Sequence, residues 1–161
     1  MGENDAQAPH LILLEAIDAA YANHTGKGLG TNCCPVEIER GDKWARLAWI
    51  NDSAPFGVLA HNAESDPKFI YVNNAAIRMF GYRRDEFIGL PSRLSASEDR
   101  RAARAAFLEI VRARGIAENY ADVRVDRSGC PFRIRDGTVW QFDGGDVVGQ
   151  AALIWFDGKV D

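Results

Sequence analysis

The sequence predicts an α+β fold, a five-stranded antiparallel sheet with helices on one face, preceded by two N-terminal helices. Two strand-like runs come before a helical middle and three follow it, so strands and helices are segregated along the chain. Two amphipathic segments lie ahead of the first strand. The 161 residues are 47% apolar, which is enough for one ordinary globular core.

The chain divides into a helical extension, residues 1–54, and a core domain, residues 55–161. A first helix is predicted over residues 9–24, where apolar side chains recur at helical spacing. Asp42 can cap a second helix over residues 43–51. The glycine-rich segment 25–35 between them lacks the strand and the spacing of a phosphate loop, so it is interpreted as a linker. Each helix must bury its apolar stripe, and we expect the extension to pack on the core or to pair with another subunit.

The core domain opens with a predicted hairpin, residues 55–62 and 68–73, joined by a turn. Asn73 or Asn74 caps a short helix that Gly81 ends, and a second short helix begins at Asp85 and runs over residues 86–90.

The longest helix is expected from a capping box of Ser95 and Glu98 to Arg114. Its predicted apolar stripe holds Ala103, Phe107, Ile110 and Val111. Its arginines are interpreted as a solvated face, partly balanced by Glu98, Asp99 and Glu109; they are Arg100, Arg101, Arg104, Arg112 and Arg114.

Three strands follow, at residues 120–127, 131–142 and 146–157. In the first, Val123 and Val125 alternate with Arg124 and Asp126. In the second, one parity carries the apolar residues Phe132, Ile134, Thr138, Trp140 and Phe142, and it also places Asp136 inside. Either Gly137 makes a β-bulge that resets the register, which is favoured, or Asp136 is a paired buried carboxylate.

Composition excludes several classes of function. A net charge of -4 argues against a nucleic-acid partner, and no run approaches the roughly 20 apolar residues that cross a bilayer. The N-terminus lacks the features of a secretory leader, so a cytoplasmic location without membrane attachment is expected. Cys33, Cys34 and Cys130 fit neither a disulfide framework nor a zinc site, and they are expected to be free thiols.

The segment FIYVNNAAIRMFGYRRDEFIGL, residues 69–90, resembles the first half of PAS domains. A closer resemblance is to the MEKHLA group of PAS-like proteins, in its stand-alone bacterial form. It rests on six stretches in the expected order: LLEAIDAAYANHTGKGL, APFGVLAHN, DPKFIYVNNAAIRMFGY, GLPSRLSASEDR, SGCPFRIRDGTVW and GQAAL. The resemblance implies a PAS-like (MEKHLA) domain over residues 55–161.

The PAS resemblance implies a pocket between the sheet and the helices. Photoactive flavin-binding relatives carry a reactive cysteine where this chain has Ser92, and a hydroxyl cannot replace a low-pKa thiolate, so a covalent flavin adduct is disfavoured. Haem-binding relatives use a histidine on the long helix, and residues 96–114 contain none. The ligand stays unknown, with a non-covalent flavin or a small metabolite left open. The candidate pocket residues are His61, Tyr71, Ser92, Arg93, Trp140 and Gln150.

Two of these assignments have plain structural readings. His61 is more simply explained as hydrogen-bonded to a neighbouring loop, and aromatic residues such as Trp140 on strands are more often core. No catalytic or metal-binding residue is assigned.

The function predicted from these features is a sensory or ligand-binding module, not an enzyme. With no output domain of its own, it signals by association, as a homodimer or with a protein partner. Two alternatives stay open: a pure interaction module without a ligand, and a small cavity enzyme that uses His61 and Asp136.

Overall fold

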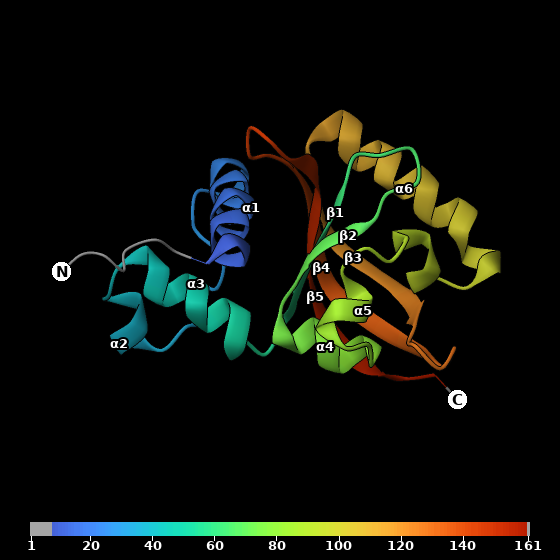
Figure 1. Cartoon of the computed structure of the whole chain (residues 1–161), viewed down its shortest axis with the longest axis horizontal. Helices are drawn as coiled ribbons and strands as arrows, with labels where there is room; N and C mark the ends of the chain where they lie inside the picture. The colour runs from blue at the N-terminus through green and yellow to red at the C-terminus, as the bar shows by residue number, and fades with distance from the viewer. Residues whose placement is uncertain (1–7, 161) are drawn as a thin grey trace.

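The structure is a computed structural model that describes residues 8–160. Three helices come first, five strands form the sheet, and a helical region lies between the second and third strands (Figure 1). The helices are α1 (Pro9–Thr25), α2 (Val36–Glu39), α3 (Lys43–Asp52), α4 (Asn74–Phe80), α5 (Arg84–Phe87) and α6 (Arg101–Arg114), with 3-10 turns at Ser92–Ser95 and Glu98–Arg100. The strands are β1 (Gly57–Asn62), β2 (Phe69–Val72), β3 (Ile116–Val125), β4 (Pro131–Asp143) and β5 (Val148–Lys159).

The strands form one antiparallel sheet in the order β2-β1-β5-β4-β3. Helices α1 to α3 lie on one side of this sheet, and α4, α5 and α6 lie on the other (Figure 1). The predicted α+β fold is therefore confirmed.

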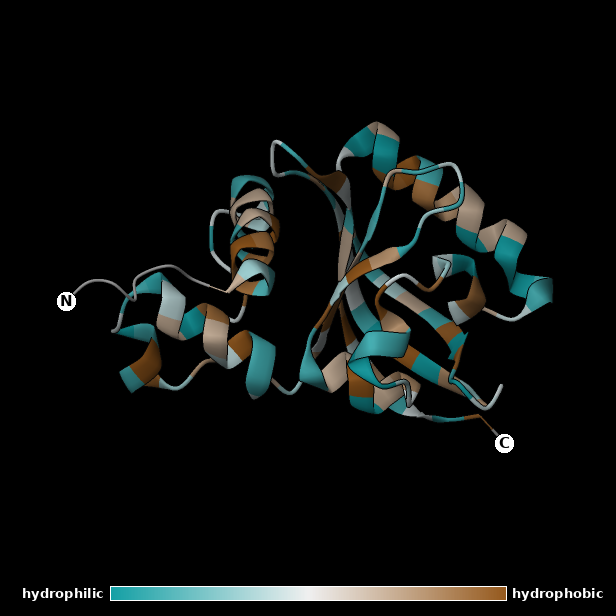
Figure 2. Ribbon diagram, viewed as in Figure 1, coloured by the Kyte–Doolittle hydropathy of each residue, from teal (hydrophilic) through white to brown (hydrophobic). Residues whose placement is uncertain are grey.

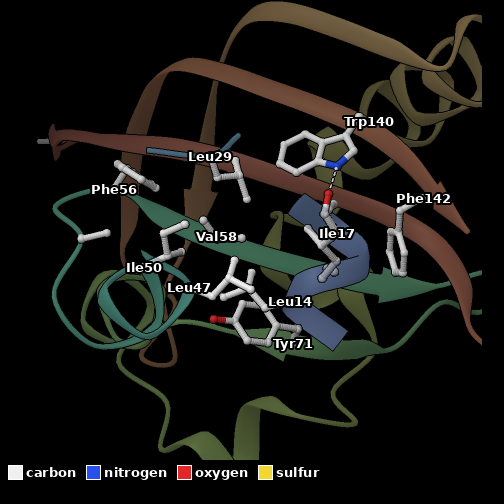
Figure 3. Packing of buried hydrophobic residues seen from close by; sticks show 13 residues of the cluster. Leu14, Ile17, Leu29, Leu47, Ile50, Phe56, Val58, Tyr71, Trp140 and Phe142 are labelled. Atoms are coloured by element: carbon white, nitrogen blue, oxygen red, sulfur yellow. Dashed lines mark hydrogen bonds between the residues drawn. The ribbon is translucent and has the colours of Figure 1, made fainter. Parts of the chain in front are cut away.

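The helical extension packs on the sheet. Leu14 and Ile17 of α1 and Leu47 of α3 are fully buried in one cluster with residues of the strands. The indole Nε1 of Trp140 donates a hydrogen bond of 3.0 Å to the carbonyl of Ile17, which ties β4 to α1 (Figure 3). This face of the sheet is consequently buried within the chain.

A buried ion pair fixes the segment between α1 and α3. The guanidinium of Arg46 donates to both carboxylate oxygens of Asp18, each at 2.8 Å. The same Asp18 accepts from the backbone N–H of Leu29, and Arg46 donates to the carbonyl of Leu29. The predicted linker is thus held against the helices by charge-assisted hydrogen bonds.

Asn73 connects three elements at the start of α4. Its side-chain oxygen accepts from the backbone N–H of Ala76, which caps the helix, and from that of Val58 on β1. Its amide nitrogen donates to the carbonyls of Ile50 and Phe56. The side chain is fully buried, and all four bonds are between 2.9 and 3.0 Å. Of the two predicted caps, Asn73 is therefore the one used.

A β-bulge interrupts β4 between Arg135 and Thr138, as the sequence favoured. Asp136 there has a φ of 48° and an exposed side chain that pairs with Arg135. A Cβ on Gly137 would lie 2.9 Å from the carbonyl oxygen of Tyr120, so glycine is needed for this close approach. The alternative of a buried Asp136 carboxylate is wrong.

The bulge also divides the apolar residues of β4 between the two faces of the sheet. Phe132 and Ile134 belong to the cluster beneath α4 and α5, whereas Trp140 and Phe142 belong to the cluster beneath α1 and α3. The predicted single apolar face of this strand is therefore wrong.

Two predicted helix starts are also wrong. Helix α5 begins at Arg84 and ends at Phe87, because the side chain of Glu86 accepts from the backbone N–H of Arg83 and caps the helix there. The capping box of Ser95 and Glu98 does not form, because the Ser95 hydroxyl donates to the carbonyl of Ser92 inside a 3-10 turn. Helix α6 begins later, at Arg101.

The buried face of α6 differs from the predicted stripe. Hydrophilic and hydrophobic residues alternate along this helix (Figure 2). Ile110 is 46% exposed, whereas Val111 is fully buried. Arg104, Phe107 and Leu108 line a cavity against the sheet. The residues of α6 that face the sheet are thus Arg104, Phe107, Leu108 and Val111. This face includes an arginine among apolar residues.

Candidate functional site

A cavity of about 50 Å³ lies between α6 and the sheet. Most of its wall is apolar or aromatic, and its hydrogen-bonding or charged side chains are His61, Ser95, Arg104, Tyr120, Arg124 and Gln150. The principal apolar or aromatic lining residues are Leu59, Phe80, Phe107, Tyr120, Ile134 and Ile154. A mostly apolar hollow with a few convergent polar groups is the usual form of a small-molecule site.

A row of polar residues crosses the sheet beneath α6. His61 on β1 pairs with Gln150 on β5, which in turn pairs with Gln141 on β4. The amide of Gln150 donates a hydrogen bond of 2.9 Å to the carbonyl of Leu108, so it ties β5 to α6. The row therefore forms the polar floor of the site.

His61 presents a hydrogen-bond acceptor to the cavity. Its Nδ1 lies 2.9 Å from the carbonyl oxygen of Asn62, and because a carbonyl only accepts, Nδ1 carries the proton. The other nitrogen, Nε2, is buried and has no partner among residues 8–160. Burial lowers the pKa of His61 to about 4, and the nearby charge of Arg104 acts in the same direction, so the ring is neutral at pH 7.

Arg104 carries a positive charge that no carboxylate of the described chain matches. It forms neither an ion pair nor a hydrogen bond within residues 8–160, and its Nε is buried. Burial, together with the charge of Arg124, lowers the pKa of Arg104 to about 10, although Tyr120 and Asp122 act in the opposite direction. The sequence-based interpretation of Arg104 as part of a solvated face is wrong.

Arg124 is the second arginine of the wall, and its charge is compensated. It is only 7% exposed and donates to the carboxylate of Asp122 at 2.8 Å. Asp122 also accepts from the hydroxyl of Tyr120, and these bonds help lower its pKa to about 2 although its partial burial opposes the shift. In the predicted alternation of β3, the inward-facing residue is Arg124, since Val123 and Val125 are only half-buried.

The buried polar atoms without a protein partner gather at one place. Within residues 8–160 they are His61 Nε2, Arg104 Nε, Ser92 Oγ and Gln141 Oε1. The first two line the cavity, and Arg104, Ser92 and Gln141 line an adjoining groove of about 510 Å³. Native proteins rarely leave such atoms unpaired, so their clustering makes this region the candidate binding site.

The sequence-predicted pocket residues are distributed over three places. His61 and Gln150 line the cavity, and Ser92 and Arg93 line the groove, where Arg93 pairs with Asp66 at 3.1 Å. Tyr71 and Trp140 lie on the opposite face of the sheet, in the cluster beneath the N-terminal helices (Figure 3).

The prediction that Tyr71 and Trp140 line this pocket is therefore wrong. The hydroxyl of Tyr71 donates to Asn51 at 2.8 Å, and the indole of Trp140 donates to Ile17. Tyr71 pairs with Ala60, one position away from His61, and successive residues of a strand point to opposite faces. The bulge in β4 turns Trp140 to the face of the sheet opposite to that of Phe132 and Ile134.

Sequence reasoning missed the contribution of α6. Phe107 stacks on Tyr120 with ring centroids 4.1 Å apart, and both line the cavity with Arg104. The spacing of Arg104, Phe107, Leu108 and Val111, at i, i+3, i+4 and i+7, was a usable signal, because it is that of a buried helix face.

A flavin does not fit the site as it stands. Pockets for ligands of that size measure about 300–1,000 Å³, several times the volume of this cavity. Arg93, the predicted pocket residue next to Ser92, is engaged by Asp66 at the groove. Residues 101–114 of α6 also contain no histidine for haem.

Replacing Arg104 by methionine will raise the free energy of unfolding by up to about 1 kcal/mol, because the substitution keeps an apolar chain and removes a guanidinium whose Nε is buried without a partner. Chemical denaturation at pH 7 measures this. Arg112, which is exposed on the same helix and pairs with Glu109, is the matched control, and Arg112→Met will change stability by less than about 0.5 kcal/mol. A clear loss of stability in Arg104→Met would identify Arg104 as a structural residue.

The sheet order, the helices α4 to α6 on one face and the cavity between them define the chain as a PAS-like domain with an N-terminal helical cover. A family model described as the MEKHLA domain matches residues 12–156, and the chain belongs to this family. A comparison with curated proteins finds no match.

Solved structures similar to this chain are PAS and LOV domains. The PAS domain of a protein from Colwellia psychrerythraea has a TM-score of 0.63 at 14% identity, covering 73% of this chain and 98% of that one. The LOV domain of a blue-light activated histidine kinase from Erythrobacter litoralis has a TM-score of 0.53 at 20% identity, covering 65% and 97%. A PAS domain of a LuxR-family transcriptional regulator from Burkholderia thailandensis, in complex with ethanol, has a TM-score of 0.53 at 14% identity, covering 68% and 94%. These likenesses establish the fold.

Two further features bear on the class of protein. Within residues 8–160 no helix is both long and apolar enough to cross a bilayer. The same part of the chain brings together no cluster of three His, Cys, Asp or Glu side chains that could hold a metal ion.

Proposed function

We propose that this protein is a sensory module that binds a small molecule in the cavity beneath α6 and passes its state on by associating with a second copy or a partner protein. The observation that carries the proposal is the clustering of unpartnered polar atoms, above all His61 Nε2 and Arg104 Nε, around one small apolar hollow. A ligand would supply the partners that the protein does not.

The size of the cavity supports a very small ligand. An apolar cavity of about 150 Å³ is filled by one benzene molecule, so one of about 50 Å³ suits a compound of only a few non-hydrogen atoms. The PAS domain from Burkholderia thailandensis was solved in complex with ethanol, a molecule of this size.

The proposed association uses the outer surface of the helical extension. The sheet face that α1 and α3 cover is buried, so it is not free for pairing. The apolar side chains of Ile12 on α1 and Val36 on α2 are 51% and 55% exposed. Ligand binding in the cavity can affect a contact on the helical extension, because the sheet lies between the cavity and the extension.

We propose a binding role in preference to catalysis. The nominated acid-base pair is not assembled, since His61 is buried beneath α6 while Asp136 is exposed at the β4 bulge and pairs with Arg135. Neither residue is therefore placed to act on the other's proton.

Native mass spectrometry of the purified protein, together with a thermal-shift screen of compounds with few atoms, tests the proposal. We expect a bound compound or a ligand-dependent rise in melting temperature, and we expect both to disappear in Ala152→Leu, which fills the cavity from β5. Sedimentation velocity with and without the ligand measures the association. A protein that binds nothing and stays monomeric would contradict the proposal, and binding of nothing by a stable dimer would favour the ligand-free interaction module.

A further inference from the structure

The charges around the cavity favour an anion. Its wall contains two arginines, Arg104 and Arg124, and no aspartate or glutamate among residues 8–160. Asp122 compensates Arg124, whereas Arg104 has no carboxylate partner in this part of the chain. The buried Nε of Arg104 lacks a partner, and a carboxylate ligand supplies one by accepting two parallel hydrogen bonds from the guanidinium.

His61 requires a hydrogen-bond donor from the ligand. Because Nδ1 of His61 donates to the carbonyl of Asn62, the neutral ring offers only the lone pair of Nε2 to the cavity. A carboxylate at neutral pH has no proton to donate to it, whereas a hydroxyl does. The ligand that satisfies both side chains therefore carries an acid group and a hydroxyl group.

The volume restricts how far apart these groups lie. Arg104 and His61 line the same cavity of about 50 Å³. A ligand that fits this volume and reaches both side chains has few atoms between its two groups, and the remaining wall, with Phe80, Phe107 and Ile134, accepts at most a short alkyl group.

We propose that the cavity beneath α6 binds a small 2-hydroxycarboxylate, with Arg104 holding the carboxylate and His61 Nε2 accepting a hydrogen bond from the hydroxyl. This inference rests on the proposed ligand-binding function and names the class of ligand. The adjoining groove, which shares Arg104, Leu108 and Gln150 with the cavity, gives the anion its route from solvent.

Three probes of nearly equal size separate the contributions of charge and hydroxyl. Glycolate carries both groups, acetate lacks the hydroxyl, and glycolamide lacks the charge. Isothermal titration calorimetry at pH 7 and constant ionic strength will show glycolate binding most tightly, acetate several-fold to tenfold more weakly, and glycolamide at least tenfold more weakly. The side-chain NMR signal of His61 will shift with glycolate.

Variants assign the two contacts. Arg104→Met will lower glycolate affinity at least tenfold, whereas the control Arg114→Met, which removes an equal charge from an exposed position of the same helix outside the cavity and the groove, will leave it within twofold. His61→Phe will abolish the preference for glycolate over acetate while retaining acetate binding. This loss of preference is a readout that a merely structural histidine would not change.

Three results would overturn the inference. If glycolamide or ethanol binds as well as glycolate, the cavity takes neutral molecules, and the proposed sensing function survives without its anionic ligand. If Arg104→Met binds glycolate as well as the unmodified protein does, the anion binds elsewhere. If no probe binds and native mass spectrometry finds no passenger, ordered water alone satisfies these atoms, and both the inference and the proposed function fall.

Discussion

Replacing Asn73 by alanine will lower the free energy of unfolding by about 3–5 kcal/mol. The substitution removes a helix cap, worth about 1 kcal/mol, and leaves the buried N–H of Val58 and the carbonyls of Ile50 and Phe56 without partners. Each unsatisfied buried group costs about 1–3 kcal/mol. Urea denaturation followed by circular dichroism measures the change.

The neighbouring Asn74 provides a matched control for this prediction. It has the same side chain in the same motif, but it is partly exposed, and its contacts are with Arg84 and the carbonyl of Asp52. Asn74→Ala will cost no more than about 1 kcal/mol. Equal losses in the two variants would show that the hydrogen bonds of Asn73 do not join the extension to the core.

Lowering the pH from 7 to 4 will destabilise the protein by about 3 kcal/mol through His61 alone. The pKa of this histidine is about 4 in the folded protein and 6.5 in the unfolded chain, so between these values the unfolded chain takes up a proton that the folded protein does not. Stability is therefore fully present above pH 6.5, falls as the pH approaches 4, and changes no further through this group below pH 4.

Denaturation curves at several pH values measure this dependence. His61→Gln, which cannot titrate in this range, will flatten it between pH 6.5 and 4, whereas His24→Gln, at an exposed position, will keep it. Asp122 acts in a separate window, since its pKa is about 2 in the folded protein against 3.8, and its contribution is lost below pH 3.8. An unchanged slope in His61→Gln would mean that the ring is not buried beside Arg104.

The proposed ligand and the pH response meet at His61. The ligand hydroxyl donates to the lone pair of Nε2, which is the atom that takes up a proton when the ring becomes charged. Binding of glycolate and protonation of His61 therefore compete, and a sensor built in this way responds to acidification as well as to its ligand.

Local features of the fold could be read from the sequence. Asn73 and Gly81 bound α4, Asp42 caps α3, and Gly137 marks the bulge in β4, because each acts through backbone groups a few residues away. The start of α6 could not be read in this way, since Ser95 bonds backward to Ser92 and uses its hydroxyl before it can cap a helix.

The candidate site was less predictable. His61 and Gln150 were nominated from the resemblance to PAS domains and do line the cavity. Tyr71 and Trp140 were nominated with them but belong to the other face, and Arg104 was assigned to solvent. These three predictions failed for the same reason. Each required the direction in which a side chain points, and the position of a residue in the sequence does not determine that direction.

The sequence by itself determined the family, the order of the elements and most of their turns and caps, because these depend on short-range spacing. Only the tertiary structure decided which face of the sheet holds the cavity. Helices α1 and α3 cover one face and α4 to α6 the other, so both faces are apolar, and alternation along a strand no longer identifies the cavity side. For the same reason, the unmatched charge of Arg104 beside the neutral ring of His61 became visible only once α6 was placed on the sheet.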